Sequence, residues 1–162
     1  DRTMQIATRI ILALLFLLMP SSAVASDEAE MKSAFLNALT ELKDRDLEGF
    51  LSYWHPEAVF LARDRLFALD RGASDYDEWA RDVDRFFART ISAEMFPVDV
   101  SYRVLGDMGI IWGRARFAVD PVGGGGSDFD SRLTVTLLKT DGKWQIVTWH
   151  ASAPPICPSV LP

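Results

Sequence analysis

The chain has 162 residues and a net charge of −6, from 17 basic and 23 acidic side chains. Its basic residues do not cluster, so the sequence lacks the positive surface that nucleic-acid binding requires. One cysteine, Cys157, and two histidines give no recognisable spacing of metal ligands, and a single cysteine cannot form an internal disulfide. We therefore expect no nucleic-acid partner, no metal and no cofactor.

Residues 1–25 have the parts of a secretory signal peptide, although the first three lie outside its pattern. The basic residue Arg9 precedes an apolar run over 10–19, and Ala23 and Ala25 form an Ala-x-Ala cleavage motif. The run is about half as long as the ~20 residues that a membrane-spanning helix needs. We expect cleavage after Ala25, a periplasmic or secreted protein, and no stable membrane anchor in the mature chain. An uncleaved N-terminal anchor is the alternative.

The next part of the chain is typical of helices. Ser26 and the acidic residues after it favour a helix start. Asp46 can cap a second, short helix, and Ser74 with Asp77 resembles a capping box before a third. Apolar residues recur at helical spacing in the first helix (Met31, Phe35, Ala38, Leu42) and in the third (Tyr76, Trp79, Val83, Phe86 or Phe87). The second of these stripes indicates core packing rather than a cofactor site.

From residue 90 onward the pattern changes to the alternation typical of strands. Long strands are predicted over 91–104, 109–119, 131–140 and 143–152. A short apolar run at 58–62, between the second and third predicted helices, is also typical of a strand. Four consecutive glycines separate the second and third long strands, and no phosphate-loop motif follows them, so they indicate a hairpin tip. Helices followed by an antiparallel meander predict an α+β fold.

The turn at Asp141-Gly142 decides which way His150 faces. A two-residue type I′ turn would pair Arg132 with Ala151 and put Arg132 and His150 on opposite faces, whereas a three-residue turn would place them opposite each other. The second register separates an apolar face from a mixed one, and register follows such sorting wherever one face is buried. The apolar face would carry Leu133, Val135, Leu137, Val147, Trp149 and Ala151, and the mixed face Arg132, Thr134, Thr136, Leu138, Trp144, Thr148, His150 and Ser152.

Four segments together resemble the nuclear transport factor 2-like superfamily: Asp46-Leu47-Glu48-Gly49-Phe50-Leu51, His55-Pro56-Glu57-Ala58-Val59-Phe60, Asp141-Gly142-Lys143-Trp144 and Trp149-His150-Ala151-Ser152-Ala153-Pro154. The likeness is strongest to SnoaL-like domains and to the association domain of calcium/calmodulin-dependent protein kinase II. It covers one domain at 26–154, which a Pro-rich tail at 155–162 follows. It implies a cone-shaped, strongly curved antiparallel sheet wrapped around the N-terminal helices, with a pocket inside and a dimer on the outer sheet face.

The resemblance does not imply one activity, because the superfamily includes both enzymes and assembly modules. At the position where ketosteroid-isomerase-like members carry their aspartate base, this chain has Ala62, which cannot accept a proton. Asp64 lies two residues further on, and it would point to the same side as Ala62 and could act as the base if the strand continues that far. His55 stands at a corner before Pro56, where exposure is the ordinary outcome.

These observations give a site hypothesis in which the mixed face lines the pocket. Arg132, Thr134 and Ser152 would bind the ligand, and Trp54 and Tyr102 would form aromatic walls. The expected function is an exported domain that binds a small, largely apolar, anionic molecule. The alternative is an isomerase, dehydratase or hydrolase in which His150 is the general acid–base and Arg132 stabilises an oxyanion. The mixed face is also compatible with a solvated outer surface.

The same orientation leads to a prediction about assembly. If the mixed face lines the pocket, the apolar face lies outside, where it would be a large apolar patch. A two-fold homodimer is the simplest way to bury such a patch. We therefore expect a homodimer through the outer sheet face, with Trp149 near its centre.

Overall fold

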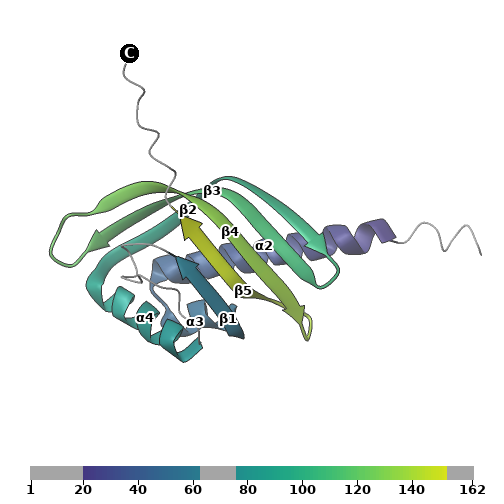
Figure 1. The fold of residues 1–162 in the computed structure, drawn as a ribbon, viewed down its shortest axis with the longest axis horizontal. Helices are drawn as coiled ribbons and strands as arrows, with labels where there is room; N and C mark the ends of the chain where they lie inside the picture. The colour runs from purple at the N-terminus through teal and green to yellow at the C-terminus, as the bar shows by residue number, and fades with distance from the viewer. Residues whose placement is uncertain (1–19, 63–75, 153–162) are drawn as a thin grey trace, which may run out of the picture.

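The computed structural model describes residues 20–62 and 76–152. The elements in chain order are α2 (Pro20–Asp44), α3 (Leu47–Ser52), β1 (Trp54–Ala62), α4 (Tyr76–Arg89), β2 (Thr90–Leu105), β3 (Met108–Pro121), β4 (Ser127–Thr140) and β5 (Lys143–Ser152). Figure 1 shows the long helix α2 running across one face of the sheet, with α3 and α4 gathered at one end.

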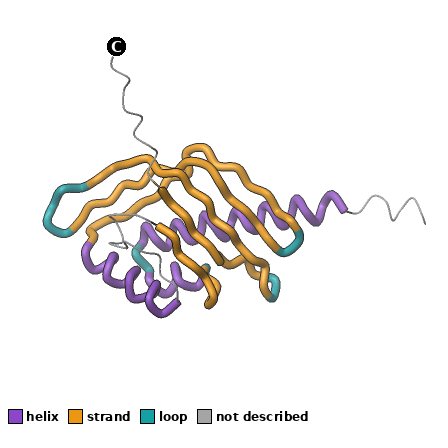
Figure 2. Tube along the Cα trace, viewed as in Figure 1, coloured by secondary structure: helices purple, strands orange, loops and turns teal. Residues whose placement is uncertain are grey.

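The five strands form one open, curved sheet in the order β1-β5-β4-β3-β2. Neighbouring strands from β2 to β5 are antiparallel, and β1 is parallel to β5. The helices cover the inner, concave face, and the outer face carries no helix among the described residues (Figure 2). The predicted α+β fold, a strongly curved antiparallel sheet wrapped around N-terminal helices, is confirmed.

Helix α2 forms where the apolar spacing predicts it. Met31, Phe35 and Ala38 are fully buried against the sheet. The helix starts at Pro20, so it passes through the predicted cleavage point after Ala25. No helix among the described residues is both long enough and apolar enough to cross a membrane.

The two shorter helices also follow their sequence signals. The Asp46 side chain caps α3 by accepting a hydrogen bond from the Gly49 N–H at 2.9 Å. Helix α4 buries Trp79, Val83, Phe86 and Phe87, as its stripe predicts. Ser74, the first residue of the predicted capping box, lies outside the described residues.

The final hairpin differs from its predicted register. Thr140 pairs with Lys143, so the turn has two residues, and Asp141 and Gly142 take the positive φ values (51° and 77°) that a type I′ turn requires. A β-bulge at Val147 then adds one residue to β5. The prediction of a three-residue turn is wrong.

Beyond the bulge, Arg132 lies opposite Ser152 and Thr134 lies opposite His150. Because the bulge shifts the pairing by one residue, Arg132, Thr134, His150 and Ser152 still share a face, as predicted. Trp144 precedes the bulge and lies on the buried face instead of the mixed one.

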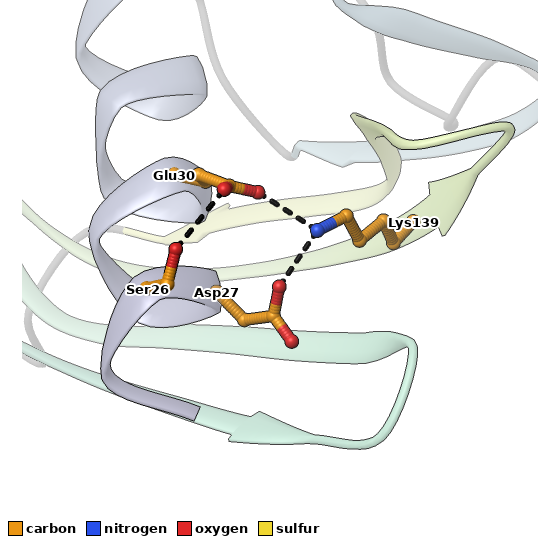
Figure 3. Close-up of polar contacts among 4 residues, drawn as sticks. All are labelled: Ser26, Asp27, Glu30 and Lys139. Carbon is orange, nitrogen blue, oxygen red and sulfur yellow. Dashed lines mark hydrogen bonds and ion pairs between the residues drawn. The ribbon is translucent and has the colours of Figure 1, made fainter. Parts of the chain in front are cut away.

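A polar cluster ties the start of α2 to the end of β4. The Lys139 ammonium donates hydrogen bonds to Asp27 at 2.6 Å and to Glu30 at 2.7 Å, and Ser26 donates to the other Glu30 oxygen at 3.2 Å (Figure 3). The hydrogen bond from Lys139 is the main reason that the pKa of Glu30 is lowered. Hydrogen bonds to Asp27 and Glu30 raise the pKa of Lys139.

Replacing Lys139 with methionine should flatten the acid side of the stability profile. A lowered folded-state pKa stabilises the fold above the pKa of an unfolded glutamate, and this contribution is lost as the pH falls through the lowered value. The free energy of unfolding of the wild type should therefore fall more steeply between about pH 5 and pH 3 than that of the variant. Urea titrations at several pH values measure both slopes.

Lys143→Met is the matched control, because Lys143 forms no ion pair among the residues that the structure describes. It removes the same charge and should keep the wild-type slope. Equal acid slopes for the two variants would show that Lys139 does not lower the pKa of Glu30 in the folded protein.

Candidate functional site

The mixed face of the last hairpin lies on the outside of the sheet. Arg132, Thr134 and His150 are exposed, and Ser152 is half-buried. The apolar face that alternates with them is buried against the helices: Leu133, Val135, Leu137, Trp149 and Ala151 are each at most 4% exposed. The prediction that the mixed face lines an interior pocket is therefore wrong.

The physical reason is that the apolar face buries far more hydrophobic surface against α2 than the mixed face could. The proposed acid–base role of His150 and oxyanion role of Arg132 required both side chains to reach one enclosed space. The structure instead places both on a surface open to solvent. Val147, at the bulge, is half-buried rather than part of an exposed apolar patch.

The two predicted aromatic walls do lie on the inner side, away from Arg132 and His150. Trp54 is 2% exposed at the start of β1. Tyr102 is half-buried on the inner face of β2, where the Lys32 ammonium lies 5.2 Å from its ring centroid. Burial raises the pKa of the Tyr102 hydroxyl. The structure thus separates the predicted site residues into an outer group of four and an inner pair.

Three other residues considered in the sequence remain: His55, which lies in the described part of the chain, and Asp64 and Cys157, which do not. His55 is the second residue of β1, and its Nδ1 accepts a hydrogen bond from the Glu57 backbone N–H at 3.1 Å within the same strand. Asp64 and Cys157 lie outside the described residues. No group of metal-ligating side chains occurs within the described ranges 20–62 and 76–152.

The interior between α3, α4 and the sheet is an aromatic cluster. The Trp54 ring centroid lies 4.8 Å from that of Trp79 and 5.9 Å from that of Trp149. Phe60 stacks on Trp79 with centroids 4.0 Å apart, and Phe50 contacts Trp54 at 5.7 Å. These rings come from α3, β1, α4 and β5, so the cluster exists only in the folded chain.

Buried polar atoms without a hydrogen-bond partner among the described residues occur at this cluster and elsewhere in the fold. The indole N–H groups of Trp54 and Trp144 and the Oδ2 atom of Asp82 are buried and have no hydrogen-bond partner among the described residues. Most buried polar atoms in native proteins are paired, because an unpaired one costs about 1–3 kcal/mol. A bound molecule or a buried water would supply the missing partner of such an atom.

Asp82 is the candidate that sequence reasoning missed. It lies on the buried stripe of α4, three residues after Trp79, and is 4% exposed. The available signal was its spacing: an acidic residue occupies the helical position between two core residues, Trp79 and Phe86, where an apolar side chain is expected. Its Oδ1 atom forms an ion pair with the half-exposed Arg85.

The outer face has its own chemical character. Trp112 and Met108 on β3 and Val59 on β1 are each about 40% exposed (40%, 41% and 39%). Arg114 and Arg132 are cross-strand neighbours with the same charge. Asp99 lies 3.7 Å from Arg114, and no ion pair to Arg132 occurs among the described residues.

The curved sheet around a long helix defines the class of protein to which this chain belongs, the nuclear transport factor 2-like fold. A superfamily member from Salmonella enterica matches it with a TM-score of 0.72 and 13% identity, over 85% of this chain and 98% of that one. A protein from Xanthomonas campestris assigned as a calcium/calmodulin-dependent protein kinase II association domain matches with a TM-score of 0.68 and 21% identity, over 78% and 87%. A type 2 hexachlorocyclohexane dehydrochlorinase matches with a TM-score of 0.66 and 13% identity, over 79% and 85%.

The sequence places the chain more narrowly. The model of the SnoaL-like domain family matches residues 31–156, and the chain belongs to that family. No curated protein sequence matches the chain. At these low identities the solved structures show the fold and not an activity.

Proposed function

We propose that this SnoaL-like domain binds a small, largely apolar molecule between its helices and the inner face of the sheet. The observation that carries the proposal is the set of unpartnered polar atoms, above all the Trp54 N–H, within the aromatic cluster. A ligand that accepts a hydrogen bond from Trp54 would remove the cost of leaving that group unpaired. Binding would then stabilise the fold by mass action.

The aromatic rings set the character of the ligand. Trp54, Trp79 and Phe60 have large apolar ring surfaces, and each indole carries one polar N–H group. A ligand of this kind is compatible with the fold, since a structural relative is a hexachlorocyclohexane dehydrochlorinase and is named for a small chlorinated hydrocarbon. The anionic character predicted from the sequence depended on Arg132 facing inward, and it is not part of this proposal.

Native mass spectrometry of the protein purified from cells, followed by binding measurements with apolar aromatic compounds, tests the proposal. We expect a bound small molecule or binding of members of the panel, together with a rise in Tm. Trp54→Phe keeps the ring packing and removes the N–H, so it should weaken binding while the protein stays folded. Unliganded protein that binds no member of the panel up to its solubility limit would refute the proposal.

Catalysis with His150 and Arg132 is not favoured by their positions on the outer face. Should a substrate be found, His150→Ala should leave its turnover unchanged, whereas substitutions at Trp54 should change it.

Self-association through the outer sheet face is a second proposed property. The structure shows that the mixed face, and not the apolar face, forms this outer surface. The exposed residues Trp112, Met108, Arg114 and Arg132 are of the types that are enriched in protein interfaces. Two copies packed face to face about a two-fold axis would bury this surface, at ~800 Å² per subunit for a standard interface. Trp149 cannot lie in that interface, because it is buried in the core of one chain.

Replacing Trp112 with glutamate should turn the dimer into a monomer, because it puts a charge into the interface and leaves the core unchanged. Trp112→Phe should keep the dimer. Sedimentation velocity at micromolar concentration measures both. A wild-type protein that sediments as a monomer would end the proposal.

Export is the third proposed property, and it depends on the signal-peptide pattern of residues 1–25. Processing after Ala25 would leave α2 starting at Ser26, directly before the Lys139 contacts with Asp27 and Glu30 (Figure 3). Intact-mass measurement of the protein from a periplasmic or secreted fraction should give an N-terminus at Ser26. Replacing Ala23 and Ala25 with bulky residues should block processing. A full-length chain in the cytoplasmic fraction of wild-type cells would contradict export.

A further inference from the structure

Asp82 is a buried carboxylate for which the fold has no evident use. It lies in the middle of α4 (Tyr76–Arg89), so it caps neither helix end. One oxygen forms an ion pair with Arg85, whose side chain is 54% exposed, and the other oxygen is buried without a partner. Most buried side-chain oxygens in native proteins have a hydrogen-bond partner, which is protein or ordered water.

The cost of this arrangement points to a function. Natural proteins keep buried polar groups that destabilise the free protein mainly where the group acts on a ligand. An apolar residue at position 82 would continue the stripe of Trp79, Val83 and Phe86 and remove the unpaired oxygen. Arg85 is half-exposed and would remain solvated without Asp82, so the loss of this ion pair would cost little on the side of the arginine.

We infer that Asp82 Oδ2 accepts a hydrogen bond from an uncharged donor, such as a hydroxyl group, on the molecule bound in the interior. This inference depends on the proposed small-molecule function and adds a class of ligand to it. An anionic ligand is excluded because it would lie against a carboxylate in a low-dielectric interior. A cation is not required, because Arg85 already compensates the charge of Asp82.

A second buried atom without a partner among the described residues is the indole N–H of Trp54. Trp54 contributes a donor and Asp82 contributes an acceptor. The two residues are connected through Trp79, which contacts the Trp54 ring at 4.8 Å and lies one helical turn before Asp82. Hydroxyl groups donate and accept at the same atom, so phenols and alcohols suit an interior with one unused group of each kind.

The experiment compares 2-naphthol with 2-methoxynaphthalene, which has the same ring system and no hydroxyl proton. Ligand-observed NMR titrations of the full chain measure both affinities. Wild-type protein should bind 2-naphthol about tenfold or more tightly than the ether, the value of a hydrogen bond to a charged group. In Asp82→Leu this preference should vanish, and the Tm of the ligand-free protein should rise by a few degrees.

Two further variants keep the interpretation clear. Asp82→Asn retains size and polarity, and it should bind 2-naphthol more weakly than wild type while folding normally. Asp84→Asn changes an exposed aspartate on the same helix and should behave as wild type. Equal affinity of wild type for the two compounds would overturn the role of Asp82 and leave the proposed function standing. If Asp82→Leu has a higher Tm and wild type shows no preference for 2-naphthol, Asp82 binds a buried water and not the ligand. Binding of neither compound would overturn the inference together with the proposed function.

Discussion

Replacing Trp149 with alanine is expected to lower the free energy of unfolding by about 3–5 kcal/mol, the range for removing a large aromatic side chain from a core. Trp149 is 4% exposed, and its ring lies 6.0 Å from Phe35 of α2 and 5.9 Å from Trp54. The substitution would therefore leave a cavity between helix and sheet. Urea unfolding followed by circular dichroism measures the change.

His150→Ala is the matched control, since His150 is the next residue of β5 and points to the opposite, exposed face. It should change the free energy of unfolding by no more than about 0.5 kcal/mol. This pair of variants tests the orientation of the sheet directly. A folded Trp149→Ala protein of unchanged stability whose oligomer dissociates would mean that the apolar face looks outward.

Replacing Gly113 with alanine should also be strongly destabilising, for a different reason. Gly113 has φ +147°, a conformation that side-chain-bearing residues rarely adopt. A Cβ atom there would lie 1.9 Å from the Asp99 carbonyl oxygen and 2.8 Å from the Val100 Cα, next to the register shift between Pro97 and Asp99 of β2. Both contacts are with backbone, which cannot rotate away. We expect about 1–3 kcal/mol from backbone strain and about 1–3 kcal/mol from the steric overlap.

Gly106→Ala separates these two causes. Gly106 has φ +62°, and a Cβ atom there would meet no atom within 4 Å. It should therefore show conformational strain alone, at the lower end of that range. Thermal unfolding of both variants gives the comparison, and equal losses would mean that β2 moves away from Gly113 without cost.

Local features of the fold could be predicted from the sequence because each depends on a few neighbouring residues. The stripe of Met31, Phe35 and Ala38 predicts a helix with one buried side, and Asp46 predicts a helix start through its own cap. Alternation along the later strands predicts the antiparallel sheet. The pairing of β1 with β5 is parallel and joins residues about 90 positions apart, such as Trp54 and Ile146, and no local pattern predicts it.

The candidate site was much less predictable. The aromatic cluster joins Trp54, Trp79 and Trp149 from three elements, and their proximity follows only from the way α4 and β5 pack. Asp82 could be noticed as an acid on an apolar stripe, but only the structure shows that it stays buried with one oxygen unpaired. A sequence gives residue types and spacing, whereas satisfaction of a hydrogen bond depends on atoms from distant segments.

By itself, the sequence determined that Arg132, Thr134, His150 and Ser152 share a face, since side chains alternate along a strand and apolar residues separate from polar ones, although it placed Trp144 on the wrong face. The tertiary structure decided how that sorting arises and which face looks inward. Beyond Val147, a two-residue turn followed by the bulge gives the same sorting as a three-residue turn, so the pattern of those residues cannot distinguish them. The helices lie on the side of Leu133 and Trp149 because burying that face removes more apolar surface from water, which leaves Arg132 and His150 on the outside.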